Sequence, residues 1–127
     1  MKPKLHFFFP ELAEKYGPSE AIILNHMLYW ITHNSMNHKN YHDGRFWTFN
    51  SIREIAKQFP YFSKSQVGRF IKSLVKKGVL ITGNYNRHRY DRTKWYALKD
   101  QKYFLENFHP FDRFKECKIM FDDNNTR

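Results

Sequence analysis

The chain has 127 residues, of which 41% are hydrophobic and 27% charged, and its formal net charge is +10. A chain of this length forms about one domain. It contains no apolar run near the ~18 residues that cross a bilayer, so we expect no membrane segment. The single cysteine, Cys117, excludes an internal disulfide and favours a cytoplasmic protein.

Two helices are predicted first along the chain. Residues 11–16 form a short helix that ends at Gly17-Pro18. Ser19 then caps a longer helix over residues 20–32, where apolar side chains recur at helical spacing. Residues 34–44 follow as a polar loop.

A turn, a strand and a short helix come next. Asp43-Gly44 is typical of a turn, and residues 45–49 read as a short strand. Asn50 or Ser51 then caps a short helix, with Glu54 placed for a capping box.

The helix predicted over residues 64–77 has clear signals at both ends. Ser63 and Gln66 form a second capping-box pattern before it, and Gly78 is placed to cap its C-terminus. Its apolar residues recur at i, i+3, i+4, i+7 and i+8: Val67, Phe70, Ile71, Leu74 and Val75.

A two-stranded hairpin and a last helix complete the predicted elements. The strands cover residues 79–82 and 93–98, and residues 83–91 form a turn-rich tip between them. In the returning strand the alternation of Trp95 and Tyr96 predicts that one ring faces the core and the other faces out. Asp100 caps the last helix, which runs to about residue 108.

The order of these elements is that of a winged helix. The expected fold class is α+β, a winged helix-turn-helix with extra N-terminal and C-terminal helices. The predicted organisation is an extension over residues 1–17, a DNA-binding domain over residues 18–99, and a C-terminal helix and tail over residues 100–127.

The positive charge is concentrated in one part of the chain. Between Arg53 and Lys102 there are 13 Lys and Arg residues and 3 Asp and Glu residues, whereas the other 77 residues carry nine of each sign. Concentrated charge of this kind is the footprint of a polyanionic partner. The alternative is a solvated basic face.

The outward face of the 64–77 helix supplies most of the candidate DNA-binding residues. We expect Arg69 to pair with guanine and Gln66 with adenine in the major groove. Gly68 permits close approach of another backbone or of DNA, and Ser73 lies on the same outward face. The residues better suited to phosphates are Lys64, Ser65, Lys72 and Lys76.

The hairpin tip supplies the rest of the candidate site. Arg87, Arg89 and Arg92 alternate with aromatic residues, and arginine in a wing enters the minor groove while tyrosine can bond to phosphate. The alternative is a solvated turn. Asp91 is expected to pair locally rather than touch DNA.

Neither a metal site nor an active site is expected. His33, His38 and His42 with Asp43 lack a Cys partner and an H-E-x-x-H pattern, and Tyr41 to Gly44 reads better as a turn. There is no G-x-S-x-G motif and no P-loop. We therefore expect a protein that is not an enzyme and that uses no cofactor.

Five segments together resemble a known family, the N-terminal winged-helix domain of phage and plasmid replication proteins, which includes replisome organisers and DnaD-type primosome proteins. The resemblance covers residues 18–98, and its most specific segment is Tyr90-Asp91-Arg92-Thr93-Lys94-Trp95-Tyr96. The other four run from Glu20 to Trp30, Asp43 to Trp47, Phe59 to Ser63 and Leu74 to Leu80.

The resemblance implies DNA binding or self-association, with other replication proteins recruited by a separate C-terminal region. Only about 28 residues follow the hairpin here, so the expected role is DNA binding, dimerisation or a repurposed module. A transcriptional repressor would use the same site residues. An adaptor or inhibitor would instead present the basic face to an acidic protein partner.

A dimer is expected, because a single module of this size has a short DNA footprint. Aromatic residues near both ends are the candidate seam, and their alternative role is in the core of a monomer. These residues are Phe7, Phe8, Phe9, Phe104, Phe108, Phe111 and Phe114.

Overall fold

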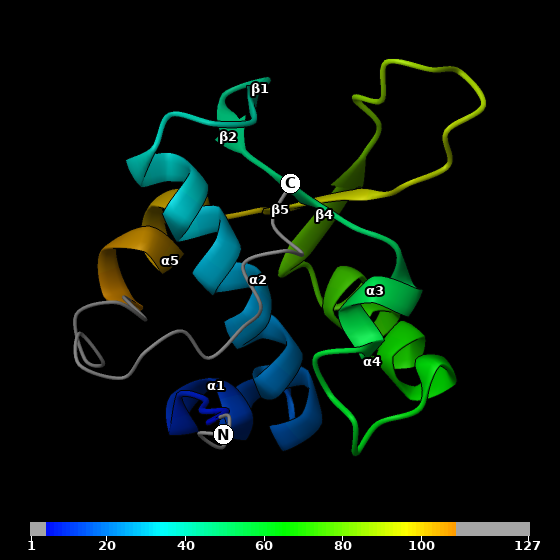
Figure 1. Cartoon of the computed structure of the whole chain (residues 1–127). Helices are drawn as coiled ribbons and strands as arrows, with labels where there is room; N and C mark the ends of the chain where they lie inside the picture. Colours follow the sequence, from blue (N-terminus) through cyan, green and yellow to red (C-terminus); the bar gives the residue numbers. More distant parts are fainter. Residues whose placement is uncertain (1–4, 109–127) are drawn as a thin grey trace.

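The computed structural model describes residues 5–108 and is an α+β structure built around one long helix. Helix α2 runs through the middle, with α1 at its N-terminal end, α5 on one side and α3 and α4 on the other (Figure 1). The helices are α1 (Pro10–Tyr16), α2 (Pro18–Met36), α3 (Ile52–Ala56), α4 (Lys64–Lys76) and α5 (Gln101–Asn107).

The strands form two small antiparallel sheets. One is the β1–β2 hairpin, and the other has the order β3-β5-β4, so that β5 is its central strand. The strands are β1 (Tyr41–His42), β2 (Arg45–Phe46), β3 (Thr48–Phe49), β4 (Leu80–Gly83) and β5 (Trp95–Leu98). Asp43 and Gly44 join β1 to β2 with φ angles of 52° and 79°, the positive values that suit a tight hairpin, so the predicted turn is confirmed.

Helix α2 is longer at both ends than the apolar spacing predicted. It starts at Pro18, with Gly17 rather than Ser19 at the N-cap, because the fixed φ of proline suits the first helical position. It continues to Met36 through what was predicted to be loop. Asn34 is fully buried there, and its side-chain nitrogen donates a hydrogen bond to the Trp47 carbonyl at 2.8 Å, so this polar residue belongs to the packed interior.

The single strand predicted over residues 45–49 is two strands with different partners. β2 pairs with β1, and β3 pairs with β5. Trp47 separates them, because its backbone N–H bonds to the Asn40 carbonyl at 2.9 Å and its indole N–H bonds to the His42 carbonyl at 2.8 Å.

The core lies in two clusters, one on each face of β5. The larger contains most of α2, the inner faces of α3 and α4, and Tyr96, and the smaller consists of Trp47, Trp95 and Ala97. The prediction that Trp95 or Tyr96 faces out is wrong. A central strand covered on both faces buries both rings.

The aromatic residues near the two ends contribute to the core of a single chain. Phe9 packs against Phe108 with ring centroids 5.0 Å apart, and Phe9, Phe104 and Phe108 are all buried. Phe8 remains 42% exposed. Phe111 and Phe114 of the predicted dimer seam, and Cys117, lie outside the described residues.

Candidate nucleic-acid interface

Helix α4 begins and ends as its sequence predicts. At its start the Ser63 hydroxyl accepts a hydrogen bond from the Gln66 N–H, and the Gln66 side-chain oxygen accepts one from the Ser63 N–H. At its end Gly78 has a φ of 78°, its N–H bonds to Val75, and the Val79 N–H bonds to Leu74. These two bonds form a Schellman motif, which fixes where α4 stops and β4 starts.

The exposed face of α4 carries five of the seven predicted residues. Val67, Ile71 and Leu74 are buried against the core. On the opposite face Lys64, Ser65, Arg69, Lys72 and Lys76 are exposed.

The other two predicted residues of α4 have partners inside the protein. The Gln66 side-chain oxygen is held in the capping box, so Gln66 would have to break that box to present both of its groups to an adenine. The Ser73 hydroxyl donates a hydrogen bond to the Glu20 carboxylate at 3.3 Å. The structure therefore places Ser73 toward α2.

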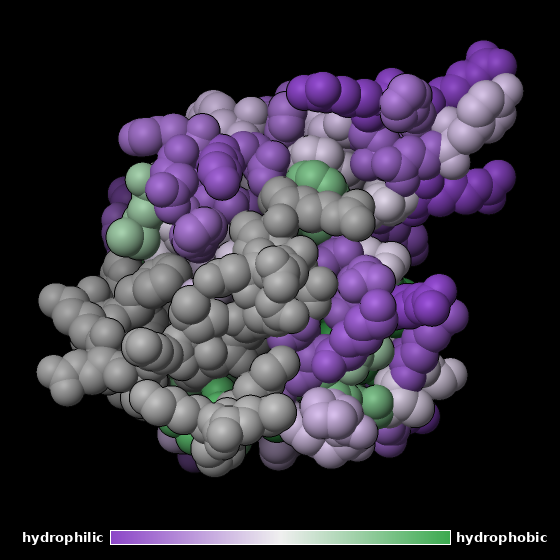
Figure 2. Space-filling view, viewed as in Figure 1, coloured by the Kyte–Doolittle hydropathy of each residue, from purple (hydrophilic) through white to green (hydrophobic). Residues whose placement is uncertain are grey.

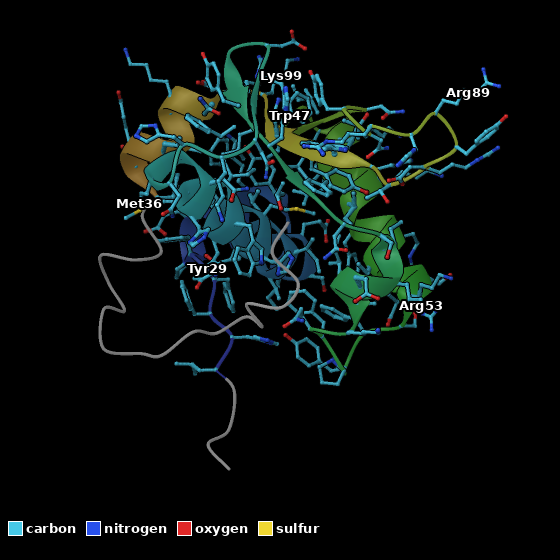
Figure 3. All side chains as sticks on the ribbon, turned by 45° about the horizontal axis from the view of Figure 1, so that its top comes forward. Tyr29, Met36, Trp47, Arg53, Arg89 and Lys99 are labelled. Carbon is cyan, nitrogen blue, oxygen red and sulfur yellow. The ribbon has the colours of Figure 1, made fainter. Side chains whose placement is uncertain are left out.

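Residues 84–94, which join β4 to β5, project from the body on the same side as α3 and α4 (Figure 1). Arg87, Arg89 and Arg92 are all exposed. Figure 3 shows Arg89 at the far end of this loop and Arg53 on α3, both pointing away from the body on that side. The hydrophilic surface in Figure 2 extends over both regions.

Tyr85 and Tyr90, the two tyrosines of the loop, have different roles. The Tyr85 hydroxyl donates to the Asp43 carboxylate, a hydrogen bond that raises the pKa of this tyrosine, and the Tyr85 ring stacks on His42 with centroids 4.4 Å apart. Tyr85 therefore anchors the loop to the β1–β2 hairpin. Tyr90 is 79% exposed and lies against the Arg89 side chain at the outer end of the loop, so it is the tyrosine available to an external partner.

A hollow of about 850 Å³ lies between α4 and the three-stranded sheet. Lys64, Arg69 and Lys72 line it from α4, and Lys94 lines it from the end of the loop. Its remaining walls are Ile52, Ser63, Ser65, Gly68, Ile71, Val75, Thr82 and Tyr96. Lys94 was not among the predicted site residues. The feature of the sequence that could have identified it is its position in the basic segment, two residues after Arg92.

A second hollow, of about 430 Å³, lies between the start of α3 and the base of the loop. Its charged lining comes from Arg53, Lys64, Asp91, Arg92 and Lys94. The two hollows are adjacent, because they share the lining residues Ile52, Lys64, Lys94 and Tyr96, and we refer to the pair as the trough. Arg53 was also missed as a site residue, because nothing in the sequence showed that α3 would face the loop.

The cations of the trough make no salt bridge within the described part of the chain. The ion pairs found between residues 5 and 108 are Lys57 with Glu54 and Lys77 with Glu20, and neither lysine lines the trough. Asp91, the acidic residue in its lining, accepts a hydrogen bond from the Thr93 N–H at 2.9 Å. The trough is therefore a strongly positive surface suited to an anionic ligand.

The histidines predicted not to form a metal site have partners of other kinds. His33 lies against the Trp30 ring at 5.5 Å, and His42 stacks on Tyr85. Over residues 5–108 no three His, Cys, Asp or Glu side chains gather in a way that could hold a metal ion. In the same range no helix is long and apolar enough to span a membrane.

Comparisons of the chain with protein-family models, with curated proteins and with solved structures find no match.

Proposed function

We propose that the chain is a winged-helix protein that binds duplex DNA, with α4 as the recognition helix and residues 84–94 as the wing. The observation that carries the proposal is the trough, where cations of α3, α4 and the loop gather without internal carboxylate partners in the described part of the chain. The order α3, turn, α4, β4, loop, β5 supports the same fold.

The arrangement suits a duplex, because the helix and the loop can occupy adjacent grooves. The exposed face of α4 enters the major groove, where Arg69 can pair with guanine and Lys76 with phosphate. The loop reaches the neighbouring minor groove with Arg87 and Arg89. The strand between the two grooves then passes over the trough.

The proposed biological role is replication initiation of a phage or plasmid, and it rests on the resemblance of residues 18–98 to the domains of such replication proteins. A repressor would use the same surface on an operator. A specific palindromic site near the chain's own gene would favour repression, whereas a site at a replication origin would favour initiation.

The test is fluorescence anisotropy of a labelled random duplex, titrated with protein at several salt concentrations. Binding whose log K falls against log salt with a slope of about −4 to −8 indicates roughly five to nine neutralised phosphates. Arg92→Ala should weaken binding and make the slope shallower by about 1, because it removes a cation beside the phosphates. Arg69→Ala, which removes a proposed base contact, should weaken binding with a smaller change in slope. Lys39→Ala removes an exposed charge outside the basic segment and is the matched control.

Absence of binding at low salt would overturn the proposal. If the affinity for the duplex falls by the same amount in Arg69→Ala, Arg92→Ala and Lys39→Ala, binding depends on net charge alone. An acidic protein captured by the wild-type chain but not by Arg69→Ala would then identify the surface as a protein-binding one.

A further inference from the structure

Gly68 stands in the middle of α4, where glycine is the least favourable residue after proline. The fold does not require it. Its φ lies outside the left-handed range, and a Cβ added at this position would meet only the Ile52 side chain, at 3.6 Å, which is ordinary van der Waals contact. Gly68 lines the trough. The missing side chain therefore leaves space for something outside the fold.

The trough around Gly68 has both apolar and cationic side chains in its lining. Ile52, Val75 and Tyr96 line it together with Lys64, Lys72 and Lys94. A ligand that fits must therefore offer apolar faces as well as anionic groups.

Tyr96 adds a hydrogen-bond donor to this surface. Only 2% of its surface is accessible, and it borders both hollows. A tyrosine hydroxyl is protonated at neutral pH, and burial raises the pKa of Tyr96 further. Within residues 5–108 the hydroxyl makes no hydrogen bond, so it can donate one to a ligand.

We propose that the trough seats the sugar–phosphate backbone of one DNA strand, with a deoxyribose against Gly68 and Ile52 and a phosphate between Lys64 and Lys94. In this arrangement the Tyr96 hydroxyl donates to the same phosphate. A backbone of apolar sugars and anionic phosphates matches the mixed apolar and cationic lining of the trough. This inference rests on the proposed DNA binding and names the contact that brings the strand closest to the protein.

The first test is Gly68→Ala, for which stability and affinity should change in opposite directions. Alanine favours the helix, so the melting temperature should rise or stay unchanged. The added methyl group occupies the sugar seat, so affinity for a duplex should fall about tenfold. Gly68→Val should bind more weakly still, because its larger side chain fills more of the seat.

The second test is Tyr96→Phe, which removes only the hydroxyl. The stability of the variant should equal or exceed that of the wild type, because the hydroxyl has no partner among residues 5–108. Its affinity for the duplex should fall severalfold. Ser73→Ala is the matched control, since it removes a hydroxyl from α4 that faces Glu20 rather than the trough.

A third measurement does not depend on any variant. In the complex with a duplex, the Ile52 δ-methyl group should show nuclear Overhauser contacts to deoxyribose protons. A bound complex without such contacts would overturn the inference.

The outcomes separate this inference from the proposed function. If the wild type binds no duplex, both fall together. If it binds with a steep salt dependence while Gly68→Ala and Tyr96→Phe bind equally well, the sugar–phosphate seat alone is refuted. If both variants weaken the binding of poly-L-glutamate as much as that of DNA, the occupant is an acidic chain, and the inference is refuted in that case too.

Discussion

Asn86 accepts a hydrogen bond from the indole N–H of Trp95 at 2.7 Å and so joins the loop to the central strand of the sheet. The Asn86 amide nitrogen also donates to the carbonyls of Asp91 and Thr93, at 3.0 and 2.8 Å. One side chain therefore ties both arms of the loop to each other and to the smaller core cluster. These hydrogen bonds of Asn86 therefore help to fix the positions of Arg87, Arg89 and Arg92.

Asn86→Leu should loosen the loop and destabilise the protein. It leaves the indole N–H of Trp95 without its acceptor, and an unsatisfied buried donor costs about 1–3 kcal/mol. Urea unfolding should show that loss, and amide hydrogen exchange should accelerate over residues 84–94. His88→Ala, at an exposed position of the same loop, should do neither. Unchanged exchange in Asn86→Leu would show that the loop is held by other contacts.

Gly83 and Gly68 should respond to alanine in opposite ways. A Cβ at Gly83 would lie 2.9 Å from two ring carbons of the buried Trp47, which cannot move aside easily. Overpacking of this kind costs about 1–3 kcal/mol. Thermal unfolding should therefore show a lower melting temperature for Gly83→Ala and an equal or higher one for Gly68→Ala. A stable Gly83→Ala protein would mean that Trp47 can repack.

Lys72 and Ser73 are neighbours on α4 but face different partners. Lys72 lines the trough, whereas the Ser73 hydroxyl bonds to Glu20, which also accepts from Lys77 at 3.3 Å. Lys72→Ala should weaken duplex binding and leave the free energy of unfolding nearly unchanged. Ser73→Ala should leave binding unchanged and lower the free energy of unfolding by about 0.5–1.5 kcal/mol. Fluorescence anisotropy and urea unfolding of both variants test these two expectations. Reduced DNA affinity in Ser73→Ala would mean that Ser73 belongs to the DNA-binding surface.

Local signals in the sequence predicted the elements whose ends are set by neighbouring residues. The capping box of Ser63 and Gln66, the Gly78 terminus and the Asp43-Gly44 turn were all confirmed, because each depends on a few consecutive residues. The extension of α2 to Met36 could not be predicted, because the buried role of Asn34 depends on Trp47, 13 positions later in the chain.

The residues of the candidate site also divide into those that local sequence patterns predicted and those that only the tertiary structure shows. The helical period identified the exposed cations of α4, whereas Arg53 and Lys94 join the trough only through tertiary packing. The period also placed Ser73 on the outward face, and only the contact with Glu20 shows that its hydroxyl is engaged elsewhere. The winged-helix fold and the DNA-binding role remain predictions.

His26 should make the stability of the protein depend on pH. Burial, and to a lesser extent the nearby His6, lowers the pKa of His26 from 6.5 to about 3. The folded state therefore keeps this imidazole neutral, while the unfolded state binds a proton below pH 6.5. The contribution of neutral His26 to stability is complete above pH 6.5 and is lost as the pH falls from there toward 3, by about 1.4 kcal/mol per pH unit.

The measurement is the free energy of urea unfolding at pH 7 and pH 5, in the wild type and in His26→Gln. The wild type should lose about 2 kcal/mol more than the variant over this interval, because glutamine takes up no proton in either state. His88→Gln, which changes an exposed histidine, should retain the wild-type pH dependence. Equal losses in the wild type and His26→Gln would mean that His26 takes up its proton in the folded protein as readily as in the unfolded chain. Water would then have to reach this imidazole, whose ring centroid lies 5.6 Å from that of Phe59 in an edge-on contact.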